Sequence, residues 1–273
     1  MVGHNRRQSV TDVLRRLDEM QGYAVKAYAK ARRHFSAMGL KNCRDVLRNY
    51  SNFDADIRFA SLAVFWMSRC IGTAPLLFSE LSSRSARVGG MASIALGSIA
   101  DDVVISRLEA IVSGATSRIL YLNAVSAITK TAEPSLHDRA ASILTRIIDN
   151  SAACSESRAT AAEGLVGLLA QTDRRRFVFR NAVKSLIRAA HDRSPNVRCC
   201  AAYALGQLEA KAAIPVLLHI AEHDRGWCRG IGSVRTEAGE AIARIRNSRR
   251  GCASCPSQKL HRAKIPGRTA TRN

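Results

Sequence analysis

The sequence has few aromatic residues, few glycines and prolines, and no long uncharged apolar run. Aromatic residues make up 5% of its 273 positions, which is little for a protein that stacks nucleic-acid bases. Glycine and proline number 17 and 6, too few for a collagen-like or low-complexity chain. The most apolar stretch, from Ile57 to Phe78, is interrupted by Arg58 and Arg69, so we expect no membrane span.

Acidic residues are scarce relative to basic ones. Lys and Arg total 42 against 22 Asp and Glu, which gives a formal charge of +20, and arginine supplies 34 of the cations. This balance favours anionic partners. Hydrophobic residues make up 47% of the chain, which excludes wholesale disorder. The N-terminal residues lack the apolar segment of a secretory signal, so we expect the 8 cysteines to be reduced and the protein to be cytoplasmic.

A repeated pattern organises most of the chain. Its clearest copy runs from Asp192 to Leu208. The positions that define this copy are Asp192, Pro195, Val197, Arg198, Leu205 and Gly206. Further copies lie at 56–65, 88–97, 117–128, 157–168 and 234–245, and arginines recur at 58, 118, 158, 198 and 235. A period of this length is typical of repeat proteins, in which stacked units bury a continuous core.

The segments between the copies are amphipathic. Apolar residues recur at helical spacing in 103–112, 140–148, 178–190 and 212–221, and no segment shows sustained two-residue alternation. The sequence therefore predicts an all-α, right-handed α-solenoid of about six antiparallel helix pairs, whose concave surface is lined by the second helix of each pair.

The pattern D-x-x-P-x-V-R-x-x-A-A-x-A-L-G at 192–206 resembles HEAT repeats, in particular the short HEAT-like repeats of the phycobilisome lyase type. The resemblance covers 40–246 and implies an α-solenoid. It implies little about function, because such repeats serve many unrelated roles.

Composition divides the chain into three parts. Residues 1–39 are expected to form an N-terminal helical cap, and 40–246 the solenoid. Residues 247–273 contain seven Lys or Arg and no Asp or Glu, which predicts a disordered basic tail.

Two sets of basic residues have different interpretations. The repeat arginines are expected to pair with acidic residues of their own or the next unit, as a structural ladder. The densest basic run is a candidate anion or nucleic-acid contact. It comprises Arg174, Arg175, Arg176, Arg180, Lys184 and Arg188, with Arg249 and Arg250 of the tail. Six neutralised phosphates would give a log–log salt slope of about −5.

No catalytic, cofactor-binding or metal-ligating residues are predicted. His219 to His223 spells H-x-x-E-H, but no acidic residue follows Glu240 to complete a zinc-protease site. Cys252 and Cys255 form a lone C-x-x-C without further ligands at diagnostic spacing. The chain contains no His-Glu dipeptide, which HEAT-like di-iron hydroxylases use.

The predicted function is a non-catalytic HEAT-repeat scaffold that binds a protein partner on its concave face or basic ends. One alternative is sequence-independent nucleic-acid binding through a basic face. This alternative only distantly resembles the HEAT-like alkylpurine DNA glycosylases. Those enzymes use tryptophans around the damaged nucleotide, and Trp66 and Trp227 of this chain do not lie in matching motifs. A bilin lyase or chromophore chaperone is a further alternative, suggested only by the repeat subtype. The sequence indicates no cofactor and no particular oligomeric state.

Overall fold

The computed structural model describes residues 9–19, 25–68, 72–115, 117–228 and 231–248. The α-helices in these residues are α1 (Val10–Glu19), α2 (Val25–Ala37), α3 (Cys43–Asn49), α4 (Ala55–Ser68), α5 (Ala74–Glu80), α6 (Ala86–Ser98), α7 (Asp102–Gly114), α8 (Arg118–Thr129), α9 (His137–Asp149), α10 (Ser155–Leu169), α11 (Phe177–Ala189), α12 (Pro195–Gln207), α13 (Ile214–His223) and α14 (Val234–Asn247). Short 3-10 helices lie at Tyr50–Asn52, Pro134–Leu136 and Lys211–Ala213. Two short strands, β1 (Trp227–Cys228) and β2 (Gly232–Ser233), form an antiparallel pair between α13 and α14.

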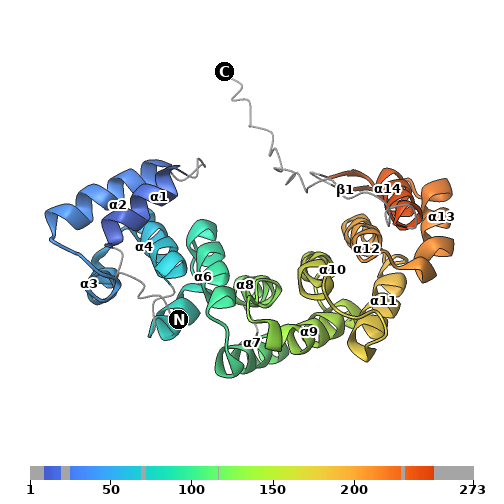
Figure 1. Ribbon diagram of the computed structural model, residues 1–273, viewed down its shortest axis with the longest axis horizontal. Helices are drawn as coiled ribbons and strands as arrows, with labels where there is room; N and C mark the ends of the chain where they lie inside the picture. Colours follow the sequence, from blue (N-terminus) through green and yellow to red (C-terminus); the bar gives the residue numbers. More distant parts are fainter. Residues whose placement is uncertain (1–8, 20–24, 69–71, 116, 229–230, 249–273) are drawn as a thin grey trace, which may run out of the picture.

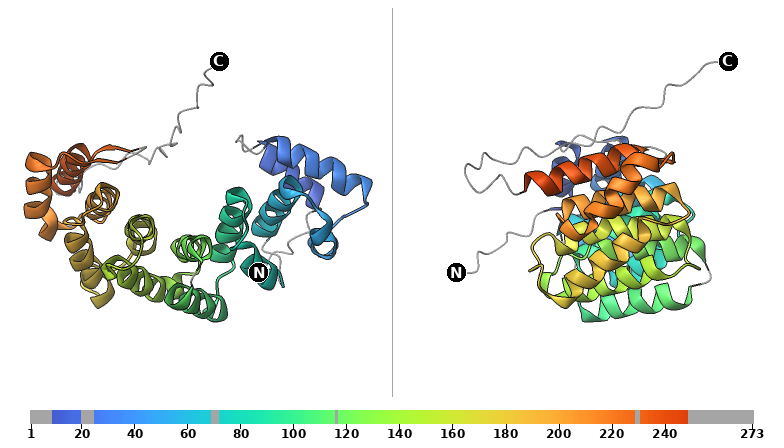
Figure 2. Two further views of the ribbon diagram at one scale, coloured as in Figure 1. Left: turned by 180° about the vertical axis from the view of Figure 1, so that it is seen from behind. Right: turned by 90° about the vertical axis from the view of Figure 1, so that its right-hand side faces the viewer.

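The helices form an arc of two layers (Figure 1). From α3 onward they alternate, so that α4, α6, α8, α10, α12 and α14 line the concave side and their preceding partners lie outside. Seen from the side, the helices run across the width of the arc (Figure 2). This arrangement confirms the predicted all-α solenoid of about six helix pairs, with the second helix of each pair on the concave side.

The division of the chain into cap, solenoid and tail stays a prediction. The cap region contains α1 and α2, which pack against each other and against α4. The predicted tail lies outside the described residues, apart from 247 and 248 at the end of α14. None of the described helices combines the length and apolarity that crossing a membrane would require.

Small residues let successive inner helices approach closely. In α12, the buried residues Ala201, Ala202 and Ala204 have no accessible surface, and Gly206 lies directly against Ala241 of α14. Within the inner layer, every helix from α4 to α12 makes extensive contact with the inner helix that follows it. Among the described outer helices, contact of this extent occurs between α9 and α11. Because the inner layer is packed more tightly than the outer one, the stack curves toward its inner side.

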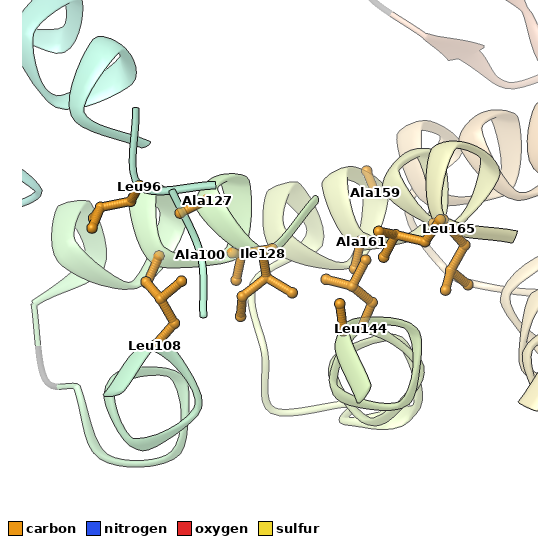
Figure 3. Packing of buried hydrophobic residues seen from close by; sticks show 14 of the residues in the cluster. Leu96, Ala100, Leu108, Ala127, Ile128, Leu144, Ala159, Ala161 and Leu165 are labelled. Atoms are coloured by element: carbon orange, nitrogen blue, oxygen red, sulfur yellow. The ribbon is translucent and has the colours of Figure 1, made fainter. Parts of the chain in front are cut away.

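Larger apolar side chains fill the space between the two layers. Figure 3 shows Leu144 of α9 facing Ala161 and Leu165 of α10, and Leu108 of α7 pointing up toward the inner layer near Leu96 of α6. All of these residues are fully buried. Burying one such leucine stabilises the fold by ~1.5–3 kcal/mol, so the layer interface holds each outer helix to its inner partner.

The best repeat copy shows how local sequence begins an inner helix. Pro195 occupies the first turn of α12, where its missing N–H leaves no hydrogen bond unmade. Asp192 Oδ1 accepts a 2.8 Å hydrogen bond from the backbone N–H of Ser194 and so shapes the preceding turn. Val197 and Leu205 are fully buried on the face that packs into the core.

We expect two glycines of adjacent inner helices to respond oppositely to alanine. A Cβ at Gly206 would lie 2.8 Å from Cα and Cβ of Ala241, whereas a Cβ at Gly167 would meet nothing within 4 Å. Gly206→Ala should therefore lower the free energy of unfolding by ~1–3 kcal/mol through overpacking. Gly167→Ala should raise it by ~0.5–1 kcal/mol, because alanine favours the helix. Urea unfolding midpoints measure both effects, and a shift of the same sign in both variants would contradict this packing.

Candidate functional site

The repeat arginines form a ladder at the edge where the inner helices begin. Each of three arginines pairs with an acidic residue of the next unit. Arg118 contacts Glu156 at 2.7 Å. Arg158 binds Asp192 through Nε at 3.0 Å and a second nitrogen at 2.9 Å. Arg58 lies 4.0 Å from Glu80, and Arg235 donates to the backbone carbonyl of Glu222 rather than to a carboxylate.

The most buried step of the ladder joins Arg198 to Asp224. The guanidinium binds both carboxylate oxygens, at 2.6 and 2.9 Å, and the side chains are 18% and 8% exposed. The hydrogen bond from Arg198 lowers the pKa of Asp224 below its ordinary value, and Asp224 raises the pKa of Arg198 in return. Asp224 also accepts a hydrogen bond from the backbone of Gly226 and thereby anchors the β1–β2 segment to α12.

The predicted basic run lies on α11 and the loop before it, in the outer layer (Figure 1). Six of its members fall within the described residues, and three of these are held in ion pairs with neighbouring units. Arg176 pairs with Asp138. Arg188 pairs with Asp149 at 2.8 Å, and Arg174 with Glu209 at 2.5 Å. Arg176 and Arg188 therefore connect α11 and its preceding loop to α9, and Arg174 connects that loop to the turn after α12. A phosphate would have to compete with these carboxylates.

The other members of the run remain available. The side chains of Arg175, Arg180 and Lys184 are exposed and form no ion pair within the described part of the chain. Arg249 and Arg250 lie outside the described residues.

A polar face runs along the concave side of the last three inner helices. On each helix it comprises residues at i, i+4, i+7 and i+11, which share one helix face. Successive helices repeat the positions after 40 and then 37 residues. We call this face the concave strip: Glu156, Thr160, Glu163 and Gly167 of α10; Asn196, Cys200, Tyr203 and Gln207 of α12; Ser233, Glu237, Glu240 and Arg244 of α14 and its cap.

The concave strip carries four glutamates and one arginine, in a chain whose net charge is +20. Glu163 forms no ion pair with any described residue, whereas Arg244 contacts Glu237 at 3.3 Å and Glu240 at 2.9 Å. Half-buried Tyr203 occupies the position that corresponds to Glu163 on one neighbouring helix and Glu240 on the other.

Carboxylates from both neighbouring helices lie around the middle of α12. Burial raises the pKa of Cys200 to about 12, with further contributions from Glu163 of α10 and Glu237 of α14. Burial also raises the pKa of Glu237, which Arg244 partly offsets. This surface was not predicted from the sequence. The signal that could have found it is the recurrence of Glu163 and Glu240 at the repeat offset from Tyr203.

The remaining sequence motifs do not assemble into a metal centre within the described residues. His219 and His223 stack on α13 with ring centroids 4.7 Å apart, and His223 is exposed. No group of three or more His, Cys, Asp or Glu among the described residues could hold a metal ion. Cys252 and Cys255 lie outside those residues.

Comparison with known families identifies HEAT repeats in residues 141–232. This segment extends from α9 to β2 and contains the best repeat copy. This part of the chain is thus similar to HEAT repeats, while the phycobilisome lyase subtype remains a prediction. No curated protein shows significant sequence similarity to the chain.

Two solved structures are similar to the chain. One is a computationally designed armadillo repeat protein for modular peptide recognition, with 17% identity, a TM-score of 0.42 and coverage of 86% of this chain and 99% of that one. The other is human deoxyhypusine hydroxylase in complex with glycerol, with 18% identity, a TM-score of 0.33 and coverage of 86% of this chain and 83% of that one. Neither likeness bears on what this chain binds.

We expect two arginines at equivalent repeat positions to differ in their contribution to stability. Arg198→Ala leaves the largely buried Asp224 unpaired and should cost ~3–5 kcal/mol. Arg118→Ala breaks a pair whose side chains are 67% and 54% exposed and should cost below ~1 kcal/mol. Denaturant unfolding of both variants measures the difference, and equal costs would contradict the burial of the Arg198 pair.

The contribution of Asp224 should depend on pH. Because its folded pKa is lowered, the carboxylate stabilises the fold above its unfolded pKa, and this stabilisation is lost as pH falls through the folded value. The stability difference between the native chain and Asp224→Asn should therefore be constant from about pH 6 to 8 and shrink below about pH 4. A difference that grows on acidification would contradict the lowered pKa.

Proposed function

We propose that the protein is a non-catalytic scaffold that binds an extended, basic segment of a protein partner along the concave strip. The observation that carries the proposal is the excess of carboxylates on this strip in a strongly basic chain. A partner segment rich in arginine would pair with Glu163 and with the other exposed carboxylates. The same carboxylates would repel a nucleic-acid backbone from this part of the concave surface.

The dimensions of the strip suit an extended peptide. Packed helices lie ~8–10 Å apart, and an extended chain rises ~3.3 Å per residue. About three residues would therefore pass each helix, and roughly nine would cross α10, α12 and α14. Tyr203, in the central helix, offers a ring face on which a guanidinium can stack. Aromatic residues at the centre of an interface commonly supply much of its binding energy.

The state of the cysteines supports a role without covalent catalysis. Cys199, Cys200 and Cys228 are buried, and burial is the main reason that the pKa of each thiol is raised. A protonated, inaccessible thiol is a poor nucleophile. These three residues are therefore better explained as core components next to the β1–β2 segment.

Charge reversal on the strip tests the proposal. The probe is a short alternating arginine–serine peptide at about physiological salt, where long-range effects are screened beyond ~8 Å. Glu163→Lys and Glu240→Lys should each weaken binding about tenfold or more, because each replaces an attractive contact by a repulsive one. Glu222→Lys is the matched control, since Glu222 is 66% exposed on outer helix α13 and should leave binding unchanged. No peptide binding by the native chain, or an equal loss in the control, would rule the proposal out.

Sequence-independent nucleic-acid binding remains a second candidate, on the outer layer. It is favoured by the three exposed cations of α11 and its preceding loop that form no ion pair in the described residues, Arg175, Arg180 and Lys184. The chromophore-chaperone alternative has no such observation in its favour.

The salt dependence of duplex DNA binding tests this second candidate. Replacing Arg175, Arg180 and Lys184 by glutamine should make the log–log salt slope shallower by about 3, because three phosphate contacts are lost. The matched control replaces the paired residues Arg174, Arg176 and Arg188 and should leave the slope nearly unchanged. If the two triple variants change the slope equally, the ion pairs do not prevent Arg174, Arg176 and Arg188 from contacting DNA, and the assignment of the contacts to Arg175, Arg180 and Lys184 is wrong.

A further inference from the structure

We infer that residues 249–273 of the chain itself occupy the concave strip when no partner is bound, so that a partner must displace them. The inference rests on the proposed function, because it assigns an intramolecular competitor to the same surface. The strip is an unpartnered face of three helices. Its occupant is identified by charge, by chain length and by the point at which the described residues end.

Charge complementarity is the first argument. Residues 249–273 contain seven basic residues and no acidic ones: Arg249, Arg250, Lys259, Arg262, Lys264, Arg268 and Arg272. The strip contains four glutamates against one arginine. Glu156 pairs with Arg118 from outside the strip, and Glu237 and Glu240 share Arg244, whereas Glu163 forms no ion pair with any described residue. The rest of the chain is basic overall, so this surface is a favourable site for the segment.

The attachment point is the second argument. Residue 249 follows directly on Ser248, at the end of α14, and α14 itself supplies Glu237 and Glu240 of the strip. The segment is thus tethered to one side of its own binding surface. Reaching Glu163 on α10 requires crossing two helix spacings, or ~20 Å.

The length of the segment is the third argument. Residues 249–273 number 25. Any chain of that length has a contour of ~80 Å, and a random coil of that length has a root-mean-square span of ~25–30 Å, so the strip lies within reach of either. A tether that matches its span gives an effective concentration of order 1 mM. A segment with an intrinsic dissociation constant of ~0.1 mM would then be about 90% bound and would weaken the apparent affinity of a competing peptide about tenfold.

The experiment compares two full-length proteins with the same arginine–serine peptide. In one protein the seven basic residues of 249–273 are replaced by glutamine, which removes the competitor and preserves the chain length. We expect this variant to bind the peptide about tenfold more tightly than the native chain. Replacing Arg175, Arg180 and Lys184 by glutamine controls for a general loss of positive charge, because these residues lie in the outer layer and should leave peptide affinity unchanged.

A second measurement adds a synthetic peptide of residues 249–273 to the variant with the neutral segment. It should bind, and Glu163→Lys and Glu240→Lys in that variant should each weaken binding about tenfold, whereas Glu222→Lys should not. Equal affinity of the native and neutral-segment proteins for the arginine–serine peptide would overturn the inference and leave the proposed function standing. Failure of both proteins to bind that peptide would overturn the proposed function, and the inference with it.

Discussion

Close approach between successive inner helices is the constraint on which the rest of the structure depends. Where Gly206 meets Ala241, the two backbones come so near that a single methyl group has no room. Because the alanine-rich inner faces pack this tightly while the outer helices are held by bulkier leucines such as Leu144, the stack bends and acquires a concave side. The curvature also brings equivalent positions of neighbouring inner helices into rows, which turns isolated glutamates into one continuous surface.

The net charge of the chain is a poor guide to its concave surface. Many arginines are used internally, since the ladder residues Arg158 and Arg198 and the outer-layer residue Arg176 are all held by carboxylates of neighbouring units. These pairs fix the spacing between repeats and withdraw positive charge from external ligands. Three of the four strip carboxylates are paired as well, Glu156 with Arg118 and both Glu237 and Glu240 with Arg244. Because two glutamates share one arginine and Glu163 forms no ion pair with any described residue, the strip keeps an excess of negative charge in a basic chain.

A basic segment beside an acidic surface offers a means of regulation that needs no change in the fold. Competition by a tethered segment sets a minimum affinity for any partner and discriminates against weakly charged ones.

The sequence by itself determined the helical content, the repeat period and the positions that enter the core. Leu205 and Val197 are recognisable as buried because helix periodicity and the repeat coincide at them. The ladder was also predictable, because the recurrence of Arg158 and Arg198 with the repeat implies recurring partners. Only the tertiary structure decided that each of these partners comes from the next unit. It also decided that Asp138, Asp149 and Glu209 neutralise half of the basic run. In the same way, it placed Glu163 on a concave face with Tyr203 and Glu240. The physical reason is that such relations join residues some 35 to 40 positions apart, whereas helix periodicity is a local property that carries no information on how one unit is rotated against the next.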